Sequence, residues 1–239
     1  MNSSNYQAVI IFLHWLNCKW EKEEVINLVK GIFDDLPYNT KFSFPQAPTI
    51  FVDYDNEEKS SWYNIISPDD LENGKNDRGL FNSIKKIEEI IEREINEGIP
   101  SENIFVIGFS QGGSLALSIA MTSRYKLGSF LVLGGFIPYH KFLKTIEKEN
   151  NKNTPIFMFH GEDDKTILYE KAQQSQQILK NDGYNIKIKG FSNVEHAPNS
   201  LMIDENINLL KNIFETRKFT KIDTFNKDNV EIVEIKQKP

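Results

Sequence analysis

A single cysteine, Cys18, and a shortage of basic residues set the first limits on this 239-residue sequence. One cysteine cannot form a disulfide within the chain, which fits a reducing compartment. The 28 Lys and Arg are outnumbered by 34 Asp and Glu, and the net charge of -6 argues against a basic nucleic-acid-binding face. The first apolar run, residues 8–13, is too short to span a bilayer and follows no basic segment. We therefore expect a cytoplasmic protein with no transmembrane segment and no nucleic-acid partner. A monomer or weak dimer is the expected assembly, although the sequence itself does not determine it.

Apolar runs typical of buried strands alternate along the chain with segments whose apolar residues recur at helical spacing. The expected strands are residues 8–13, 42–44, 49–54, 104–107, 130–133, 156–159 and 186–189, and the expected helices are residues 25–33, 80–95, 115–120, 139–149, 172–179 and 203–214. The polar residues 55–61 are expected to form a loop. This alternation predicts a mostly parallel central sheet with helices on both faces, in one domain.

The most informative stretch is NIFVIGFSQGGSLALSIA, residues 103–120. Ser110 stands at the centre of G-x-S-x-G, between an apolar strand and a helical segment. This arrangement is the nucleophile elbow of α/β-hydrolases, in which a sharp turn lifts the serine hydroxyl above the sheet and the glycines let strand and helix approach closely. The pattern also occurs by chance, but the strand and helix around it favour a catalytic serine. The backbone N–H of Gln111, directly after Ser110, is then one donor of an oxyanion hole.

A serine nucleophile needs a general base and a carboxylate that orients the base, and α/β-hydrolases have these in the order Ser, Asp or Glu, His. The chain has four histidines. His14 precedes the serine, His140 lies in a polar segment typical of a solvated surface, and His160 ends a strand, as a buried structural histidine would. His196 follows the last expected strand and is the candidate base; the alternative is an exposed loop histidine.

The orienting acid is expected after the preceding strand, residues 156–159. Glu162, Asp163 and Asp164 all lie there. The alternative is that all three are solvated carboxylates on a loop. If Ser110 and His196 act together, one of these three acids must complete the set, and the order of residues alone leaves the choice among them open.

Several motifs resemble the acyl-protein thioesterase, lysophospholipase and carboxylesterase family of small α/β-hydrolases. The resemblance covers roughly residues 9–214. The segments that carry it are GIPSENIFVIGFSQGGSLALSIAM (residues 98–121) for the family's elbow, FLHWL (12–16) for F-L-H-G-L-G, PQAP (45–48) for P-x-A-P, SWY (61–63) for Trp-Phe-Asp and HGEDDKTI (160–167) for H-G-x-x-D.

The resemblance implies an α/β-hydrolase fold and assigns roles residue by residue. The implied nucleophile, base and orienting acid are Ser110, His196 and Asp164, with Asp163 as the fallback acid. The backbone N–H of Leu16 is implied as the second oxyanion donor, and Trp15 and Trp62 as substrate-binding residues. No cofactor or metal is implied, and the segments richest in acids and histidines lack zinc-ligand spacing such as H-E-x-x-H.

Two departures from the family pattern affect the expected substrate. Trp15 and Asn17 replace glycines of the oxyanion loop; because Asn tolerates positive φ and Trp does so poorly, the loop must either keep its path under strain or follow a different one. Trp15 is also expected to fill part of the acyl channel. The charged residues 53–61 replace an apolar stretch, and residues 49–54 then cover the site. Each buried methylene contributes about 0.8 kcal/mol, so a charged lid argues against a strong palmitoyl preference.

The sequence therefore predicts a serine hydrolase that cleaves acyl esters or thioesters through an acyl-enzyme, acting on an acylated protein or a small ester or lipid. The alternative is a catalytically impaired binding protein that keeps the fold, which the substitution at Trp15 suggests. We expect a hydrolase domain at residues 1–217 and a C-terminal extension at residues 218–239. Within the extension, VEIVEI (residues 230–235) is expected to form an edge strand, and a frayed tail is the alternative.

Overall fold

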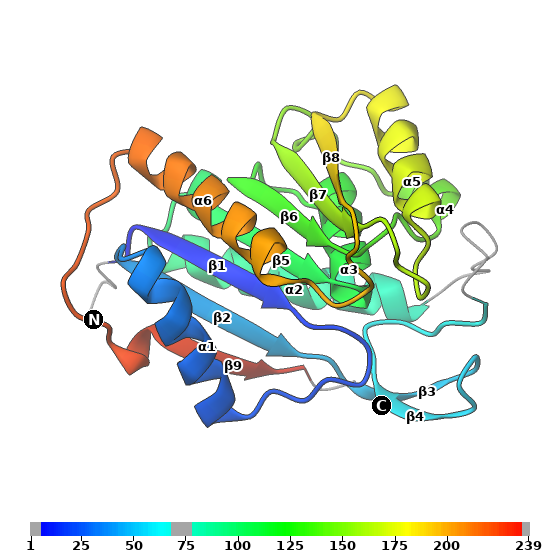
Figure 1. The fold of residues 1–239 in the computed structure, drawn as a ribbon, viewed down its shortest axis with the longest axis horizontal. Coiled ribbons are helices and arrows are strands. Elements are labelled where there is room, and N and C mark those ends of the chain that lie inside the picture. Colours follow the sequence, from blue (N-terminus) through cyan, green and yellow to red (C-terminus); the bar gives the residue numbers. More distant parts are fainter. Residues whose placement is uncertain (1–5, 68–77, 236–239) are drawn as a thin grey trace.

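The computed structural model describes residues 6–67 and 78–235. Its centre is a seven-stranded sheet, in which every neighbouring pair of strands is parallel (Figure 1). The strand order is β8-β7-β6-β5-β1-β2-β9. The strands are β1 (Ala8–Leu13), β2 (Thr40–Gln46), β5 (Ile104–Phe109), β6 (Ser129–Leu133), β7 (Ile156–Gly161), β8 (Ile186–Phe191) and β9 (Val230–Glu234).

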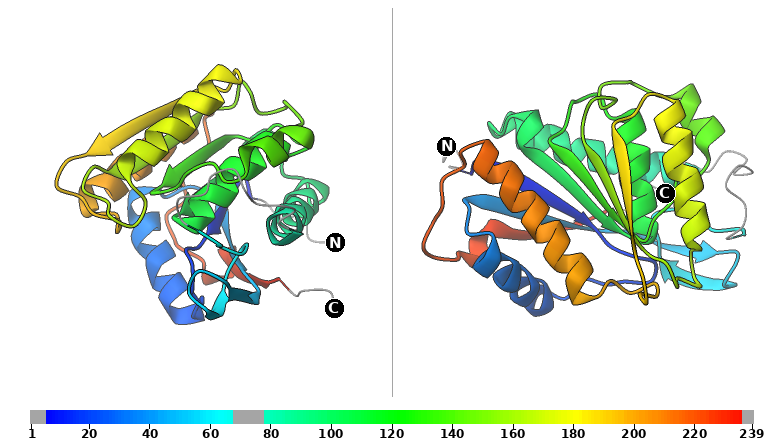
Figure 2. Two further views of the ribbon diagram at one scale, coloured as in Figure 1. Left: turned by 90° about the vertical axis from the view of Figure 1, so that its right-hand side faces the viewer. Right: turned by 45° about the horizontal axis from the view of Figure 1, so that its top comes forward.

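Helices cover both faces of the sheet, as the strand–helix alternation predicts (Figures 1 and 2). One face carries α2 (Arg78–Asn96), α3 (Gln111–Thr122), α4 (His140–Thr145) and α5 (Tyr169–Asn181); the other carries α1 (Lys22–Asp35) and α6 (Ser200–Thr216). Single 3-10 turns occupy Ser101–Asn103 and Lys227–Asn229. Successive side chains of a strand point to opposite faces, so Val9 and Ile11 of β1 join the core under α2 and α3, while Ala8 and Ile10 join the core under α1 and α6. The predicted parallel sheet with helices on both faces is thereby confirmed.

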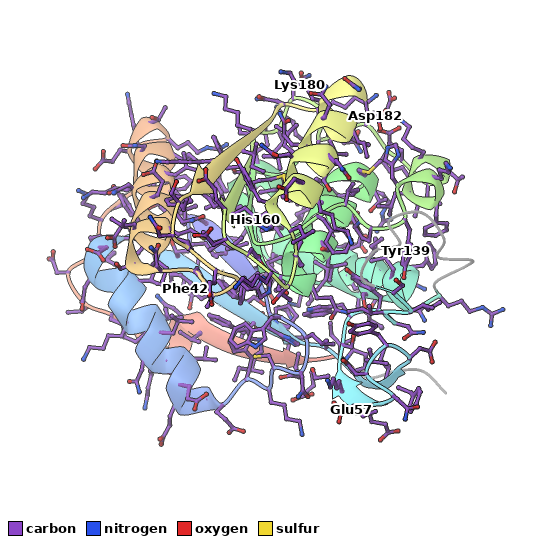
Figure 3. The ribbon with its side chains drawn as sticks, turned by 45° about the vertical axis from the view of Figure 1, so that its right-hand side comes forward. Phe42, Glu57, Tyr139, His160, Lys180 and Asp182 are labelled. Atoms are coloured by element: carbon purple, nitrogen blue, oxygen red, sulfur yellow. The ribbon has the colours of Figure 1, made fainter. Side chains whose placement is uncertain are left out.

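A separate two-stranded hairpin, β3 (Thr49–Val52) and β4 (Glu57–Ser60), corrects the expectation that residues 55–61 form a loop. The hairpin lies beside the main sheet, and Figure 3 labels Glu57 at the edge of the molecule. Lys59 forms ion pairs with Asp55, at 2.9 Å, and with Glu57, at 2.6 Å. The hairpin buries little apolar surface, and β4 contains no apolar residues. No apolar alternation therefore marks β4 as a strand in the sequence.

The segment after β6 is less helical than expected. Of residues 139–149, only His140–Thr145 form a helix, α4, which ends where Ile146 leaves the helical conformation. His140 is not the freely solvated side chain that the sequence suggests. Its Nε2 lies 2.6 Å from Oδ2 of Asp182, at the end of α5, and the side chain is half-buried.

The C-terminal strand β9 lies at the opposite edge of the sheet from β8 and pairs with β2, from Phe42 opposite Val230 to Gln46 opposite Glu234. Charged groups reinforce this pairing. Glu231 accepts a hydrogen bond from Ser43 Oγ at 3.0 Å and forms ion pairs with Arg93 and Lys41. In the described part of the chain, no helix has the length and apolar character needed to cross a bilayer.

Candidate active site

The turn between β5 and α3 holds Ser110 in a strained conformation. Its φ of 56° and ψ of -119° lie outside the regions that a serine usually adopts. Two glycines permit the turn: a Cβ on Gly108 would come within 3.0 Å of the Gly112 carbonyl, and a Cβ on Gly112 would come equally close to the carbonyls of Leu13 and His14. The G-x-S-x-G spacing therefore reflects two backbone contacts that side chains would prevent.

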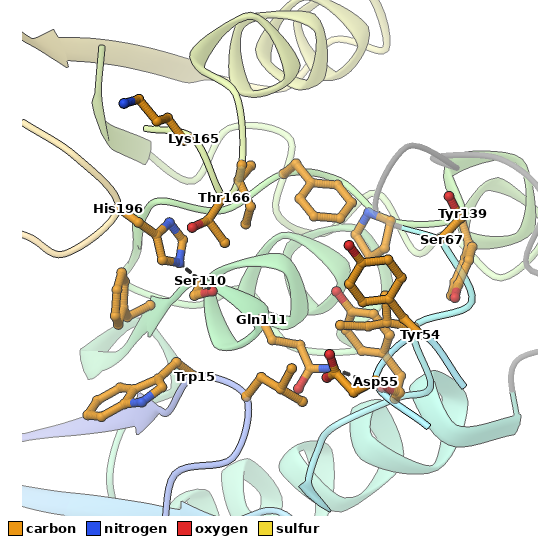
Figure 4. Close-up of a pocket in the computed structure, with 17 residues that line it drawn as sticks. Trp15, Tyr54, Asp55, Ser67, Ser110, Gln111, Tyr139, Lys165, Thr166 and His196 are labelled. Atoms are coloured by element: carbon orange, nitrogen blue, oxygen red, sulfur yellow. Dashed lines mark hydrogen bonds between the residues drawn. The ribbon is translucent and has the colours of Figure 1, made fainter. Parts of the chain in front are cut away.

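Hydrogen bonds join the three side chains that the sequence suggested as a catalytic set. Nε2 of His196 lies 2.9 Å from Oγ of Ser110 (Figure 4), and Nδ1 of His196 lies 2.7 Å from Oδ2 of Asp164. Ser110 follows β5, Asp164 follows β7 and His196 follows β8. The carboxyl ends of these three strands lie at the same edge of the parallel sheet. Because an ionised carboxylate only accepts, Nδ1 carries the proton, and Nε2 is left to accept from the serine hydroxyl.

The surroundings of Asp164 keep its carboxylate ionised. Burial alone would raise the pKa of Asp164, but hydrogen bonds from His160, His196 and the backbone of Ile167 hold that pKa well below its ordinary value. Oδ1 accepts from the backbone N–H groups of Thr166 and Ile167, at 2.8 and 2.9 Å.

The neighbouring candidates are placed differently. His160 is fully buried, as expected, with Nε2 at 2.7 Å from the Ile167 carbonyl and 3.1 Å from Oδ2 of Asp164. Asp163 is exposed, and Glu162 accepts from Ser192 instead. Of the three acids after β7, only Asp164 is joined to His196 by a hydrogen bond in the described structure.

The loop after β1 faces the elbow. Leu16 and Gln111 both line the cavity above Ser110, and within the described residues neither backbone N–H donates to another protein group. Of the two residues that replace family glycines, Asn17 takes the left-handed conformation, with φ of 61°, and Trp15 does not. The positive φ that the loop needs therefore falls on Asn17, a residue type that tolerates it, and not on Trp15. Trp15 is not strained by the turn.

The cavity has a volume of about 440 Å³ and is bounded at one end by Trp15 and His196 and at the other by Tyr54 and Tyr139 (Figure 4). Trp15 is 41% exposed and packs edge-on against Phe109, with ring centroids 5.6 Å apart. Trp15 therefore borders the cavity above Ser110, and its role as a substrate-binding residue stays a prediction.

Trp62 requires a correction, because it is not among the described residues that line this cavity. The side chain is buried behind the loop, where its Nε1 donates to the His14 carbonyl at 2.7 Å. Its place in the SWY motif gave no sign of this orientation, since the partner lies 48 residues away.

The side chain of Gln111 is a feature that the sequence did not reveal. Its Nε2 donates to Oγ of Ser61 and to the Tyr63 carbonyl, each at 2.8 Å, and its Oε1 accepts from the backbone N–H of Trp62 at 3.0 Å. These bonds tie the first residue of α3 to residues 61–63. Among the described residues, no three His, Cys, Asp or Glu side chains are grouped to hold a metal ion.

Comparison with known proteins agrees with the fold. Residues 2–213 match the phospholipase/carboxylesterase family. An acyl-protein thioesterase 1 homolog 2 from Dictyostelium discoideum is 34% identical over 216 residues, covering 85% of this chain and 91% of that protein. A probable carboxylesterase SOBER1-like from Arabidopsis thaliana is 31% identical over 190 residues, covering 78% of this chain and 72% of that protein.

A solved structure of similar fold agrees with the family match. The crystal structure of Arabidopsis thaliana SOBER1 matches with a TM-score of 0.76 at 26% identity, covering 87% of this chain and 99% of that one. The parallel sheet and the serine on its strained turn define an α/β-hydrolase. The chain belongs to the phospholipase/carboxylesterase family, and the family resemblance read from the sequence is confirmed.

Proposed function

We propose that this protein is a serine hydrolase that cleaves acyl esters or thioesters, with Ser110 as nucleophile, His196 as general base and Asp164 as orienting acid. The observation that carries the proposal is the unbroken series of hydrogen bonds from Ser110 Oγ through His196 to Asp164, at 2.9 and 2.7 Å. The alternative of an impaired binding protein is not favoured, because the relatives are named as thioesterases and carboxylesterases and the three side chains are aligned.

The proposed mechanism has two acyl-transfer steps. His196 Nε2 takes the proton of Ser110 as Oγ attacks the acyl carbonyl, and the ionised Asp164 stabilises the imidazolium that forms. Collapse of the tetrahedral intermediate expels the alcohol or thiol, which receives the proton from His196. A water molecule, deprotonated by His196, then attacks the acyl-serine and releases the acid. The backbone N–H groups of Leu16 and Gln111 are proposed to donate to the oxyanion in both steps.

A fluorophosphonate probe tests the nucleophile. We expect the wild-type protein to be labelled at Ser110, because His196 activates that hydroxyl, and Ser110→Ala to show no labelling. Ser114→Ala serves as a matched control, because Ser114 is a buried serine one turn further along α3. The Ser114→Ala protein should be labelled at Ser110 as fast as the wild-type protein. Equal labelling of wild type and Ser110→Ala would remove the basis of the proposal.

The cavity favours short or medium acyl chains. Tyr63 and Tyr139 pack edge-on across one end, with ring centroids 6.0 Å apart, and Tyr139 donates to the Asn64 carbonyl at 3.1 Å, which fixes this wall. Each methylene of the acyl chain that is buried against apolar surface contributes about 0.8 kcal/mol, or up to roughly fourfold in kcat/KM. This gain ends when the acyl chain is long enough to contact the two tyrosines.

A series of p-nitrophenyl esters and matching thioesters measures this limit. We expect kcat/KM to rise from acetyl to about octanoyl, following the gain per methylene, and to fall again by palmitoyl. Tyr63→Ala should move the optimum to longer chains, and melting temperatures control for a loss of fold. A steady rise up to palmitoyl in the wild type would contradict the limit and favour acylated proteins bearing long chains as substrates.

We propose two further features of the protein. Its one cysteine, Cys18, is buried, which supports a cytoplasmic location. The division into a hydrolase domain at residues 1–217 and a C-terminal extension at residues 218–239 is supported by the match to the family, which ends at residue 213. The pairing of β9 with β2 supports a structural role for the extension.

A further inference from the structure

His14 has no place in the proposed proton transfer, yet it is fully buried directly behind the loop that faces Ser110. Its Nδ1 lies 2.7 Å from the Trp15 carbonyl oxygen. Its Nε2 lies 3.0 Å from the backbone N–H of Ala47 and 3.1 Å from Nε2 of Gln46. The orientation of the Gln46 amide is known, because its Oε1 accepts from the backbone N–H of Trp20 at 2.8 Å, which leaves the NH₂ group facing His14.

These partners determine the protonation state of the ring. A backbone N–H only donates, so Nε2 of His14 must be the unprotonated acceptor for Ala47 and Gln46. A carbonyl oxygen only accepts, so Nδ1 must carry the proton and donate it to Trp15. The imidazole is therefore neutral, with one defined tautomer. Burial lowers the pKa of His14 to about 4, against the hydrogen bond to Trp15, which raises it.

The Trp15 carbonyl and the Leu16 N–H belong to the same peptide unit. In a planar trans peptide these two groups point in opposite directions. A donor that holds the carbonyl from behind consequently directs the N–H forward, toward the cavity that Leu16 shares with Ser110 and Gln111. The Trp15 carbonyl also accepts from the Cys18 N–H, at 3.3 Å.

The peptides on either side are held as well. The indole N–H of Trp62 donates to the His14 carbonyl at 2.7 Å, and the Asn17 N–H donates to the Ser60 carbonyl at 2.8 Å. Three consecutive peptide units of the loop thus have defined orientations. Of these, the unit that presents Leu16 N–H is held by the only titratable side chain in the group.

We propose that His14 is a positioning residue, whose Nδ1–H holds the Trp15 carbonyl and so directs the Leu16 N–H at the oxyanion. The inference rests on the proposed function, because it assumes that Leu16 donates to a tetrahedral intermediate formed at Ser110. Such donors act by being oriented before the reaction begins, so a peptide free to rotate would lose most of its effect on kcat and little on substrate binding.

Two substitutions separate this role from simple packing. In His14→Asn the amide nitrogen stands near the position of Nδ1 and can donate to Trp15, but the Ala47 N–H loses its acceptor and Gln46 loses one of several. In His14→Gln the amide oxygen reaches the position of Nε2 and can accept from Ala47, but the donor to Trp15 is lost. The inference predicts that the two variants rank differently in activity and in stability. His14→Asn should be the more active variant, and His14→Gln should have the higher melting temperature.

The measurement uses p-nitrophenyl butyrate, with active sites counted by fluorophosphonate titration so that only folded enzyme enters kcat. We expect His14→Gln to lower kcat about 100-fold with KM within about twofold of wild type, and His14→Asn to stay within about tenfold of wild-type kcat. The affinity for a trifluoromethyl ketone, whose adduct with the serine carries an oxyanion, should weaken in His14→Gln by the same factor as kcat.

The outcomes distinguish this inference from the function on which it rests. If wild type neither labels nor hydrolyses the ester, the proposed function itself fails. If wild type is active and the activities of the two variants follow their melting temperatures, with His14→Gln the more active, His14 is only a packing residue and the inference is overturned. Unchanged ketone affinity in His14→Gln would overturn it too.

Discussion

Asp164→Asn is expected to lower kcat for ester hydrolysis about 10⁴-fold while leaving the fold intact. Oδ1 of Asp164 accepts two backbone hydrogen bonds, from Thr166 and Ile167, so the amide oxygen of an asparagine will stay there. The amide NH₂ must then face His196 at the position of Oδ2. A donor at that position requires Nδ1 of His196 to accept, and the neutral ring moves its proton to Nε2. A protonated Nε2 facing Ser110 cannot act as the base.

Asp163→Asn is the matched control, because Asp163 is the adjacent, exposed carboxylate and its loss changes the charge by the same amount. We expect its kcat to stay within about twofold of wild type, as for surface substitutions generally. Steady-state kinetics at pH 8, with melting temperatures recorded for both variants, gives the comparison. A kcat for Asp164→Asn within tenfold of wild type, or a large loss in Asp163→Asn, would show that another acid orients His196.

Gly112→Ala is expected to lower the free energy of unfolding by about 3 kcal/mol or more, which for a chain of this length is a fall in melting temperature of roughly 6–12 °C. The added Cβ would lie within 3.0 Å of the Leu13 and His14 carbonyls. These are backbone atoms, so β1 and α3 must move apart to make room. The same displacement reaches the loop that holds Leu16, and activity should fall with stability.

Gly31→Ala provides the control for adding a methyl group to a glycine in a helix. Gly31 lies within α1, and a Cβ there would meet nothing within 4 Å. Alanine is favoured over glycine in a helix interior by about 1 kcal/mol, so this variant should melt slightly higher than wild type. Thermal unfolding followed by circular dichroism tests both. If Gly112→Ala melts with wild type, the close approach of strand and helix does not require glycine at that position.

The parts of the fold that the sequence predicted best are those where one local pattern determines the structure. The run at residues 104–107 is buried on both faces, and G-x-S-x-G has a backbone reason at each glycine. The second strand of the hairpin, β4, was missed because all four of its residues are polar and only Ser60 is buried, so neither apolar alternation nor a buried apolar run marks it as a strand.

The placement of residues in the candidate site was predictable where chain order and motif limited the choice, as for His196 and Ser110, which lie within hydrogen-bonding distance. Roles that depend on distant hydrogen-bond partners were not. His14 was set aside as a base, and nothing in FLHWL indicates that Ala47 and Gln46 supply donors to one ring nitrogen. Trp62 was expected at the substrate for a similar reason, because a motif shows that a tryptophan is present but not where its indole N–H points.

The position of β9 has a consequence for how the chain assembles. β2 is among the first strands to be synthesised, yet the partner on its outer side includes Glu231, 188 residues after Ser43. Contacts so distant in sequence form late, because a long loop must close before they contribute. During synthesis the outer backbone of β2 therefore stays open, as an unpaired strand edge able to associate with other chains, until β9 has been synthesised and can pair with it.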